Sequence, residues 1–161
     1  MKDKYKSLPY RVGAIGIVFD KNDKVLIVQL KDYDPEEWNF PGGGREPGES
    51  GEQNIIRELS EELGTDASNF KIIAKSRFTI QYDFPEEMRI NKSPKALMYR
   101  GQKKEQFFVR FIGDKKNISI DNKELIKYKW VATKDLAKYL IFNNGRQYKE
   151  ATLALDEYRE L

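Results

Sequence analysis

Residues 43–65 read GGREPGESGEQNIIRELSEELGT, and this stretch decides how the rest of the chain is interpreted. It opens with glycines, turns at a Pro-Gly pair and continues as a helix in which Glu58, Glu61 and Glu62 stand at positions i, i+3 and i+4. Carboxylates at that spacing share one face of a helix, where they repel one another. A hard divalent cation would remove the repulsion, so the stretch predicts a metal site.

The sequence also predicts where this helix begins and ends. Ser50 is a suitable N-cap, with Gln53 three residues later as its capping-box partner. The helix is expected to run to Leu63 and to end at Gly64 in the left-handed conformation. Its apolar stripe is made of Ile55, Ile56, Leu59 and Leu63.

The composition narrows the chemistry that this chain can perform. The 161 residues, with a net charge of +3, suit a single domain spanning residues 1–161, and they contain neither cysteine nor histidine. Serine-histidine, cysteine-histidine and zinc-thiolate chemistries are therefore excluded, and carboxylates with a hard metal remain. The N-terminal residues lack an apolar run and no stretch has the length of a membrane span, so we expect a cytoplasmic protein with no membrane partner.

The remaining pattern predicts an α+β fold, an α/β/α sandwich with a mixed sheet. Residues 11–19 and 24–30 indicate a hairpin, and the glycines at 42–44 are expected to form a loop. Residues 83–103 form a long polar segment, which we expect to be functional or mobile. Further strands are expected at 38–40, 70–82, 106–112 and 128–131, and helices at 133–139, capped by Thr133, and 146–161.

The spacing of residues 43–65 resembles the signature box of the Nudix hydrolases: G, five residues, E, seven residues, then R-E-apolar-any-E-E-any-G-apolar. Only Thr65 departs from it, where an aliphatic residue is usual. The resemblance implies a loop-helix-loop that holds Mg²⁺ or Mn²⁺, with Arg57 orienting the carboxylates and Glu49 pairing with Arg57. The implied metal ligands are the carbonyl of Gly43 and the carboxylates of Glu58, Glu61 and Glu62. The implied reaction is attack by water on one phosphorus of a nucleoside diphosphate linked to another group.

A second likeness covers residues 78–111, which resemble the subgroup of RNA 5′-pyrophosphohydrolases and asymmetric dinucleoside tetraphosphate hydrolases. Tyr82 precedes a Phe-Pro pair, and Gly-Gln-Lys at 101–103 precedes an aromatic strand. Tyr82 is then expected to stack on a base or donate to a phosphate, or else to be a half-buried strand tyrosine. Lys103 and Lys104 could meet distal phosphates, or lie in a solvated loop, and Arg11 has the same ambiguity.

The sequence leaves the roles of several other residues open. Phe142 and Tyr148 are suited to stacking on a second base or to core packing. The general base is Glu105, Glu124 or a glutamate of the box. The chain departs from the subgroup at 29–30, where Gln-Leu replaces paired arginines, and in an acidic segment before Trp38.

The sequence therefore predicts a Mg²⁺- or Mn²⁺-dependent pyrophosphohydrolase that cleaves a nucleoside polyphosphate. The favoured substrates are dinucleoside polyphosphates or 5′-triphosphate RNA ends. The alternatives are a house-cleaning (d)NTP or ADP-ribose pyrophosphatase, a nucleotide-sensing module of the same fold, and an RNA-interaction protein. The number of metal ions, the phosphorus attacked and the oligomeric state do not follow from the sequence.

Overall fold

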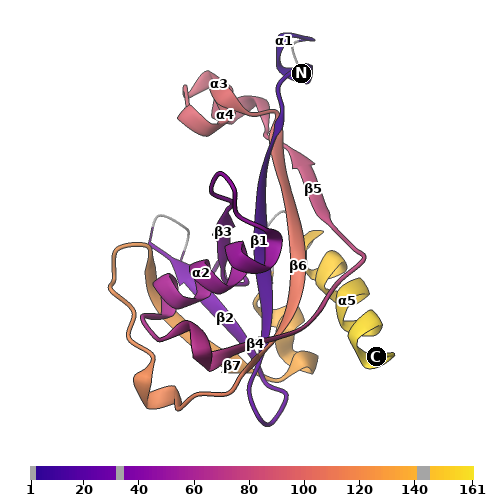
Figure 1. Ribbon diagram of the computed structural model, residues 1–161. Helices are drawn as coiled ribbons and strands as arrows, with labels where there is room; N and C mark the ends of the chain where they lie inside the picture. The colour runs from indigo at the N-terminus through magenta and orange to yellow at the C-terminus, as the bar shows by residue number, and fades with distance from the viewer. Residues whose placement is uncertain (1–2, 32–34, 141–145) are drawn as a thin grey trace.

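The computed structural model describes residues 3–31, 35–140 and 146–161 and shows a mixed sheet between helices (Figure 1). The sheet order is β4-β6-β1-β2-β7, with β3 pairing with β1 and β5 pairing with β6. The strands are β1 Tyr10–Phe19, β2 Val25–Leu30, β3 Gly42–Gly44, β4 Phe70–Lys75, β5 Ile80–Asp83, β6 Gly101–Phe111 and β7 Leu125–Val131. The α-helices are α1 Asp3–Lys6, α2 Gly51–Leu63, α3 Glu86–Ile90, α4 Pro94–Met98 and α5 Arg146–Arg159, and the 3₁₀ helices are η1 Ala67–Asn69, η2 Lys115–Asn117 and η3 Thr133–Lys138.

The centre of the sheet is a long parallel pair. β1 and β6 run together from Tyr10 opposite Gly101 to Phe19 opposite Arg110. The other pairings of the sheet are antiparallel, including the predicted hairpin of β1 and β2. β6 begins five residues earlier than predicted, because its first half is polar and an apolar pattern marks only the buried half.

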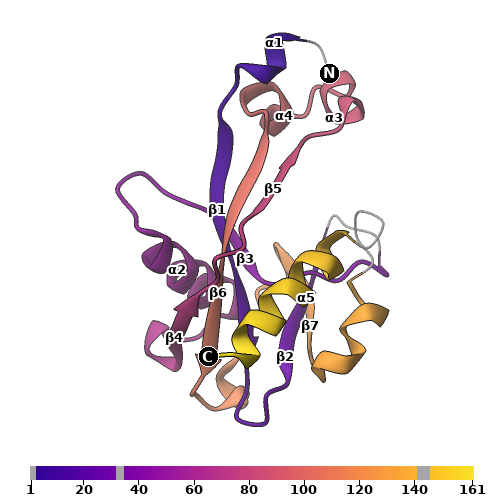
Figure 2. The same cartoon turned by 90° about the vertical axis from the view of Figure 1, so that its right-hand side faces the viewer.

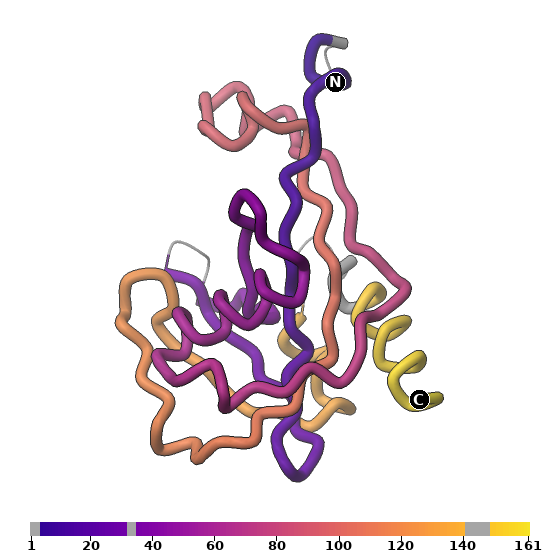
Figure 3. The backbone as a smooth tube through the Cα atoms, viewed as in Figure 1, coloured from indigo at the N-terminus to yellow at the C-terminus, as the bar shows by residue number. Residues whose placement is uncertain are grey.

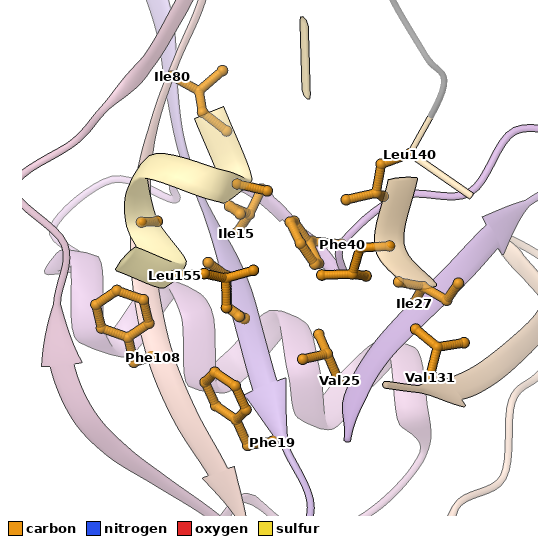
Figure 4. Packing of buried hydrophobic residues seen from close by; sticks show 14 residues of the cluster. Ile15, Phe19, Val25, Ile27, Phe40, Ile80, Phe108, Val131, Leu140 and Leu155 are labelled. Carbon is orange, nitrogen blue, oxygen red and sulfur yellow. The ribbon is translucent and has the colours of Figure 1, made fainter. Parts of the chain in front are cut away.

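Each face of the sheet carries its own apolar core, so the predicted α/β/α sandwich is confirmed. α2 covers one face, where Ile55 and Leu59 lie in the same buried cluster as Phe107. α5 covers the other face (Figure 2), where Leu155 clusters with Phe19 and Phe108 (Figure 4). Alternate residues of one strand therefore belong to different cores.

The helix α2 begins and ends as predicted. Ser50 accepts a hydrogen bond from the backbone N–H of Gln53, whose side chain accepts from the Ser50 N–H in return. Gly64 closes the helix in the left-handed conformation with φ of 56°. This capping fixes where the carboxylates of the helix stand relative to the sheet.

Three local predictions are wrong. Residues 38–40 form no strand, since Asn39 makes only an isolated bridge with Val28. The predicted glycine loop is instead β3, which pairs with β1 from Gly13 to Ile15. A Cβ on Gly42 or Gly13 would collide with the backbone of the opposite strand, so the missing side chains allow this pairing. Thr133 does not cap a helix, because η3 follows Ala132 without a side-chain cap.

Residues 70–103 are more structured than predicted. The expected strand at 70–82 is divided into β4 and β5, and the polar segment that follows holds α3 and α4. We call residues 84–100 the outer segment, because it lies at the far end of β1, β5 and β6 (Figure 3). Its buried Arg89 donates to the carbonyl oxygens of Phe84 at 2.6 Å and Arg100 at 2.9 Å. In the parts of the chain described, no helix has the length and apolarity to cross a membrane.

Candidate active site

Arg57 organises the carboxylates of α2. Its Nε donates to Glu49 at 2.7 Å and its Nη2 donates to the carbonyl of Gly44 at 2.9 Å. Its Nη1 donates to Glu58 at 3.0 Å and to Glu61 at 3.2 Å. These hydrogen bonds lower the pKa of Glu49 and raise that of Arg57. The arginine thus links the loop before α2 to the carboxylates on the helix.

Glu58 and Glu62 lie against β3. A Cβ on Gly43 would collide with the carboxylate of Glu58, and the backbone N–H of Gly42 donates to Glu62. Asn54, which the sequence pattern does not single out, donates to the carbonyl of Gly43 at 3.3 Å and of Gly44 at 3.1 Å. The glycine strand therefore brings its backbone oxygens to the same place as two carboxylates.

Glu62 is the most deeply buried carboxylate of this group. It is 9% exposed, and its Oε2 has no hydrogen-bond partner among the described residues. Burial, and next the negative charge of Glu58, raise the pKa of Glu62 to about 8. Burial also raises the pKa of Glu58, although the hydrogen bond from Arg57 opposes this. A buried carboxylate oxygen without a donor fits a hard cation, which would restore the lost solvation.

Glu61 lies apart from that pair. Its side chain is 61% exposed and turns toward Arg57. Within residues 3–31, 35–140 and 146–161, no three carboxylates converge closely enough to form a ready metal cluster. Glu58 and Glu62, which both lie against β3, offer carboxylate oxygens, and these are hard ligands.

Cationic side chains reach the same glycines from the other direction. A Cβ on Gly44 would collide with the guanidinium of Arg11. In the sheet register, Gln102 pairs with both Arg11 and Tyr82, and Lys104 lies two residues further along β6. Because side chains alternate along a strand, Arg11, Tyr82 and Lys104 share one face of the sheet, and the exposed Lys103 lies on the opposite face.

Lys104 is electrostatically coupled to the carboxylates. Burial, and then the charges of Arg11 and Lys95, lower its pKa to about 8, while Glu62 and Glu58 oppose the shift. Lys95 comes from α4 and carries no signal in the sequence, since only the folded chain brings α4 next to β1.

The two acidic candidates outside the box separate in space. The charge of Glu124 raises the pKa of both Glu58 and Glu62, so Glu124 lies within electrostatic range of them. Glu105 instead pairs with Arg45 and with Lys75, the latter at 2.9 Å, on the sheet face that α2 covers. Of these two acids, the structure brings only Glu124 to the carboxylates of α2.

Gln29 is buried and donates to the carbonyl of Pro35, so position 29 presents no cation. Phe142 and the side chain of Tyr148 lie outside the described residues.

Comparisons with known proteins identify the family of the chain. A family model described as the NUDIX domain matches residues 9–152. The chain is 34% identical over 139 residues to an RNA pyrophosphohydrolase of Sphingopyxis alaskensis, covering 85% of the chain and 87% of the relative. It is 36% identical over 146 residues to an RNA pyrophosphohydrolase of Nitratiruptor, covering 88% and 90%.

Solved structures share the fold at lower identity. The dihydroneopterin triphosphate pyrophosphohydrolase of E. coli superposes with a TM-score of 0.66 at 21% identity, covering 92% of this chain and 99% of that one. An Ap4A hydrolase of C. elegans gives a TM-score of 0.62 at 16% identity, covering 91% and 98%. The chain therefore belongs to the Nudix family and is a hydrolase that acts on pyrophosphate bonds.

Proposed function

We propose that this hydrolase depends on Mg²⁺ or Mn²⁺ and cleaves 5′-triphosphate RNA ends, with dinucleoside polyphosphates as the second candidate substrate. One observation carries the proposal. Glu58 lies against Gly43 on one face of β3, while the Arg11 guanidinium lies against Gly44 on the other face, so opposite charges flank this short strand. A phosphate chain bound along the edge of β3 that faces away from β1 would have the carboxylates on one side and the cations on the other.

The residues that would hold the metal are Glu58, Glu62 and the carbonyl of Gly43, with Glu61 turning inward from Arg57. Hydrolases of this family generally use divalent metals. The bound metal would neutralise phosphate charge and acidify a water molecule. Hard oxygen donors favour Mg²⁺ or Mn²⁺ over softer ions.

The other side chains would bind the substrate, orient the carboxylates and accept a proton from the attacking water. Arg57 keeps Glu58 in position, because it bonds the carboxylate and the Gly44 carbonyl at once. Arg11 and Lys104 would bind phosphate oxygens by charge-assisted hydrogen bonds. Tyr82 would stack on the base next to the phosphates or donate to a phosphate oxygen, and Glu124 would accept the proton of the attacking water.

The choice between substrates rests on two observations that point in different directions. The curated relatives, at 31–36% identity, are named RNA pyrophosphohydrolases, which favours a triphosphate RNA end. The buried Gln29 occupies a position where the RNA-cleaving subgroup has an arginine, which favours a smaller dinucleotide. For either substrate we propose a cytoplasmic location, which also suits a chain without cysteine.

The test is a comparison of kcat/KM for triphosphate RNA, dinucleoside tetraphosphate, dNTPs and ADP-ribose, with Mg²⁺ and with Mn²⁺. We expect the first two substrates to lead and chelation to abolish turnover. Tyr82→Ala should raise KM more than it lowers kcat, because a stacking residue binds substrate and transition state alike. A wild-type preference for ADP-ribose, unaltered by Tyr82→Ala, would contradict the substrate assignment.

A further inference from the structure

The glycine strand β3 is paired with β1 along one edge, and its other edge carries backbone groups without a strand partner. The N–H of Arg45 donates to the carbonyl of Val12 in β1 at 3.0 Å. In a trans peptide the N–H and the carbonyl point in opposite directions, so the carbonyl of Gly44 points away from β1. The N–H of Gly42 points the same way, because the carbonyl of Pro41 accepts a hydrogen bond from β1.

Side chains from one face of α2 reach these two backbone groups, since α2 packs beside β3 (Figure 1). Asn54, Glu58 and Glu62 stand at i, i+4 and i+8 and therefore share that face. Glu62 accepts a hydrogen bond from the N–H of Gly42, and Nδ2 of Asn54 donates to the carbonyl of Gly44 at 3.1 Å. One face of α2 thus occupies the edge of β3 with which a neighbouring strand would otherwise pair.

Asn54 contributes hydrogen-bond donors to this contact. Its side chain is fully buried, and Nδ2 also donates to the carbonyl of Gly43 at 3.3 Å. Its Oδ1 has no hydrogen-bond partner among the described residues. Burying an amide costs free energy where its hydrogen bonds are not made, and an apolar side chain would fill the same space without that cost. The donors that point to β3 are therefore what asparagine adds at this position.

We propose that Asn54 is a positioning residue that fixes β3 against α2, so that the glycine backbone and the carboxylates of Glu58 and Glu62 keep the arrangement that binds metal. The inference rests on the proposed function, since it concerns the same metal site. Arg57 donates to the same Gly44 carbonyl at 2.9 Å, but it also bonds the carboxylates. The side-chain hydrogen bonds of Asn54 go to β3, so a change at Asn54 tests the placement of the strand without removing a bond to a carboxylate.

The test measures the affinity for Mn²⁺ in the absence of substrate, by electron paramagnetic resonance of the free ion, for wild type, Asn54→Leu and Asn69→Leu. Leucine has the same branching as asparagine but no donor. Groups that orient a metal site typically contribute 10–100-fold to affinity, so Asn54→Leu should weaken Mn²⁺ binding by about tenfold or more. Asn69 is the matched control, because its amide donates to Thr65 at 2.7 Å in the turn after α2. Asn69→Leu should lower the melting temperature and keep the wild-type affinity for Mn²⁺.

Asn54→Ala provides the second variant, because it removes the donor without requiring the buried position to hold a branched apolar side chain. It should weaken Mn²⁺ binding to a similar extent. Wild-type affinity for Mn²⁺ in both Asn54 variants, with only a lower melting temperature, would make Asn54 a structural residue and overturn the inference. Equal weakening in Asn69→Leu would also overturn it, since a general loss of stability would then explain the effect.

Failure of the proposed function gives a different result. If wild type binds no Mn²⁺ and turns over in the presence of a chelator, the metal dependence is wrong and the role of Asn54 is wrong with it. If wild type binds Mn²⁺ but cleaves neither triphosphate RNA nor dinucleoside tetraphosphate, only the substrate assignment is wrong, and the Mn²⁺ affinities still decide the role of Asn54.

Discussion

The carboxylate half and the cationic half of the candidate site differ in how many hydrogen bonds the protein makes to their charged groups. On α2, Arg57 bonds Glu49, Glu58 and Glu61, so these carboxylates are held by the protein itself. On the opposite side, Arg11, Lys95 and Lys104 come from three separate elements and have no comparable network among the described residues. The difference indicates that the carboxylate half is organised before ligand binds, whereas the cationic half has donors left free for phosphate.

Glu62→Gln should give the largest effect, because it changes a buried carboxylate oxygen that has no donor among the described residues. Losing a metal ligand at the reacting centre should reduce kcat on the order of a hundredfold or more. Steady-state kinetics with Mg²⁺ measure the change. A near wild-type rate would show that Glu62 does not hold the metal.

Metal binding by the carboxylate half can also be tested without measuring turnover. Metal that binds only the folded state raises the melting temperature, so millimolar Mg²⁺ or Mn²⁺ should raise it for wild type. The double variant Glu58→Gln/Glu62→Gln should show no such shift. Equal shifts in both proteins would place the bound ions elsewhere on the molecule.

Arg57→Lys should give the second largest effect. Lysine keeps the charge, but it cannot bond Glu49, Glu58 and the Gly44 carbonyl together. Groups that orient metal ligands typically contribute 10–100-fold, so we expect activity to fall by about that factor and the Mg²⁺ concentration for half-maximal rate to rise. If only thermal stability changed, Arg57 would be a structural residue and not a positioning one.

Lys104→Gln should act on the cationic half alone, through substrate binding. Loss of one charge-assisted bond should raise KM for a triphosphate substrate by about tenfold and leave kcat within about threefold. Lys103→Gln is the matched comparison, since Lys103 lies on the opposite face of the same strand. A larger effect at Lys103 would assign the phosphate contact to that residue, as the sequence alone suggested.

This contrast also explains what the sequence could predict. Glu58, Glu62, Arg57 and the capping residues belong to one loop and helix, so their relative positions follow from local helical geometry. The pairing of Arg57 with Glu49 and the cap at Ser50 are accordingly present in the structure. The α/β/α layers were predictable for the same reason, because each strand and helix carries its own apolar pattern.

The cationic half could not be predicted in this way. Which of Lys103 and Lys104 faces the site depends on the register of β6 against β1 and β5, which neighbouring residues do not encode. Lys95 depends on the path of the outer segment, which is polar and gives no periodic signal. β3 was missed because glycine usually weakens a strand, whereas here it permits close pairing with β1.

The smallest effect on activity is expected from a buried charge at the opposite end of β1. Asp20 is 2% exposed and accepts hydrogen bonds from Lys115 at 2.7 Å and from the backbone N–H groups of Asn22 and Lys24. Burial alone would raise the pKa of Asp20, but these hydrogen bonds and the Lys115 charge outweigh it and lower the pKa below the usual 3.8. The protein thus satisfies this charge fully, unlike those of Arg11 and Lys104.

Asp20→Asn should therefore change stability and leave kcat and KM within about twofold. The pKa of Asp20 is lower in the folded protein than in the unfolded chain, so the folded state binds fewer protons. The ionised carboxylate therefore stabilises the fold above pH 3.8. This contribution is lost as the pH falls through the pKa of the folded state. The variant should lose about 1–3 kcal/mol of unfolding free energy at pH 7, and the loss should shrink in acid. Urea unfolding at pH 7 and in acid measures this loss of unfolding free energy. Asp156→Asn, which changes an exposed ion-pair residue, is the control and is expected to change little. A loss that stayed constant with pH would show that the charge of Asp20 does not contribute, and a matching fall in kcat would mean that this end of β1 is coupled to the active site.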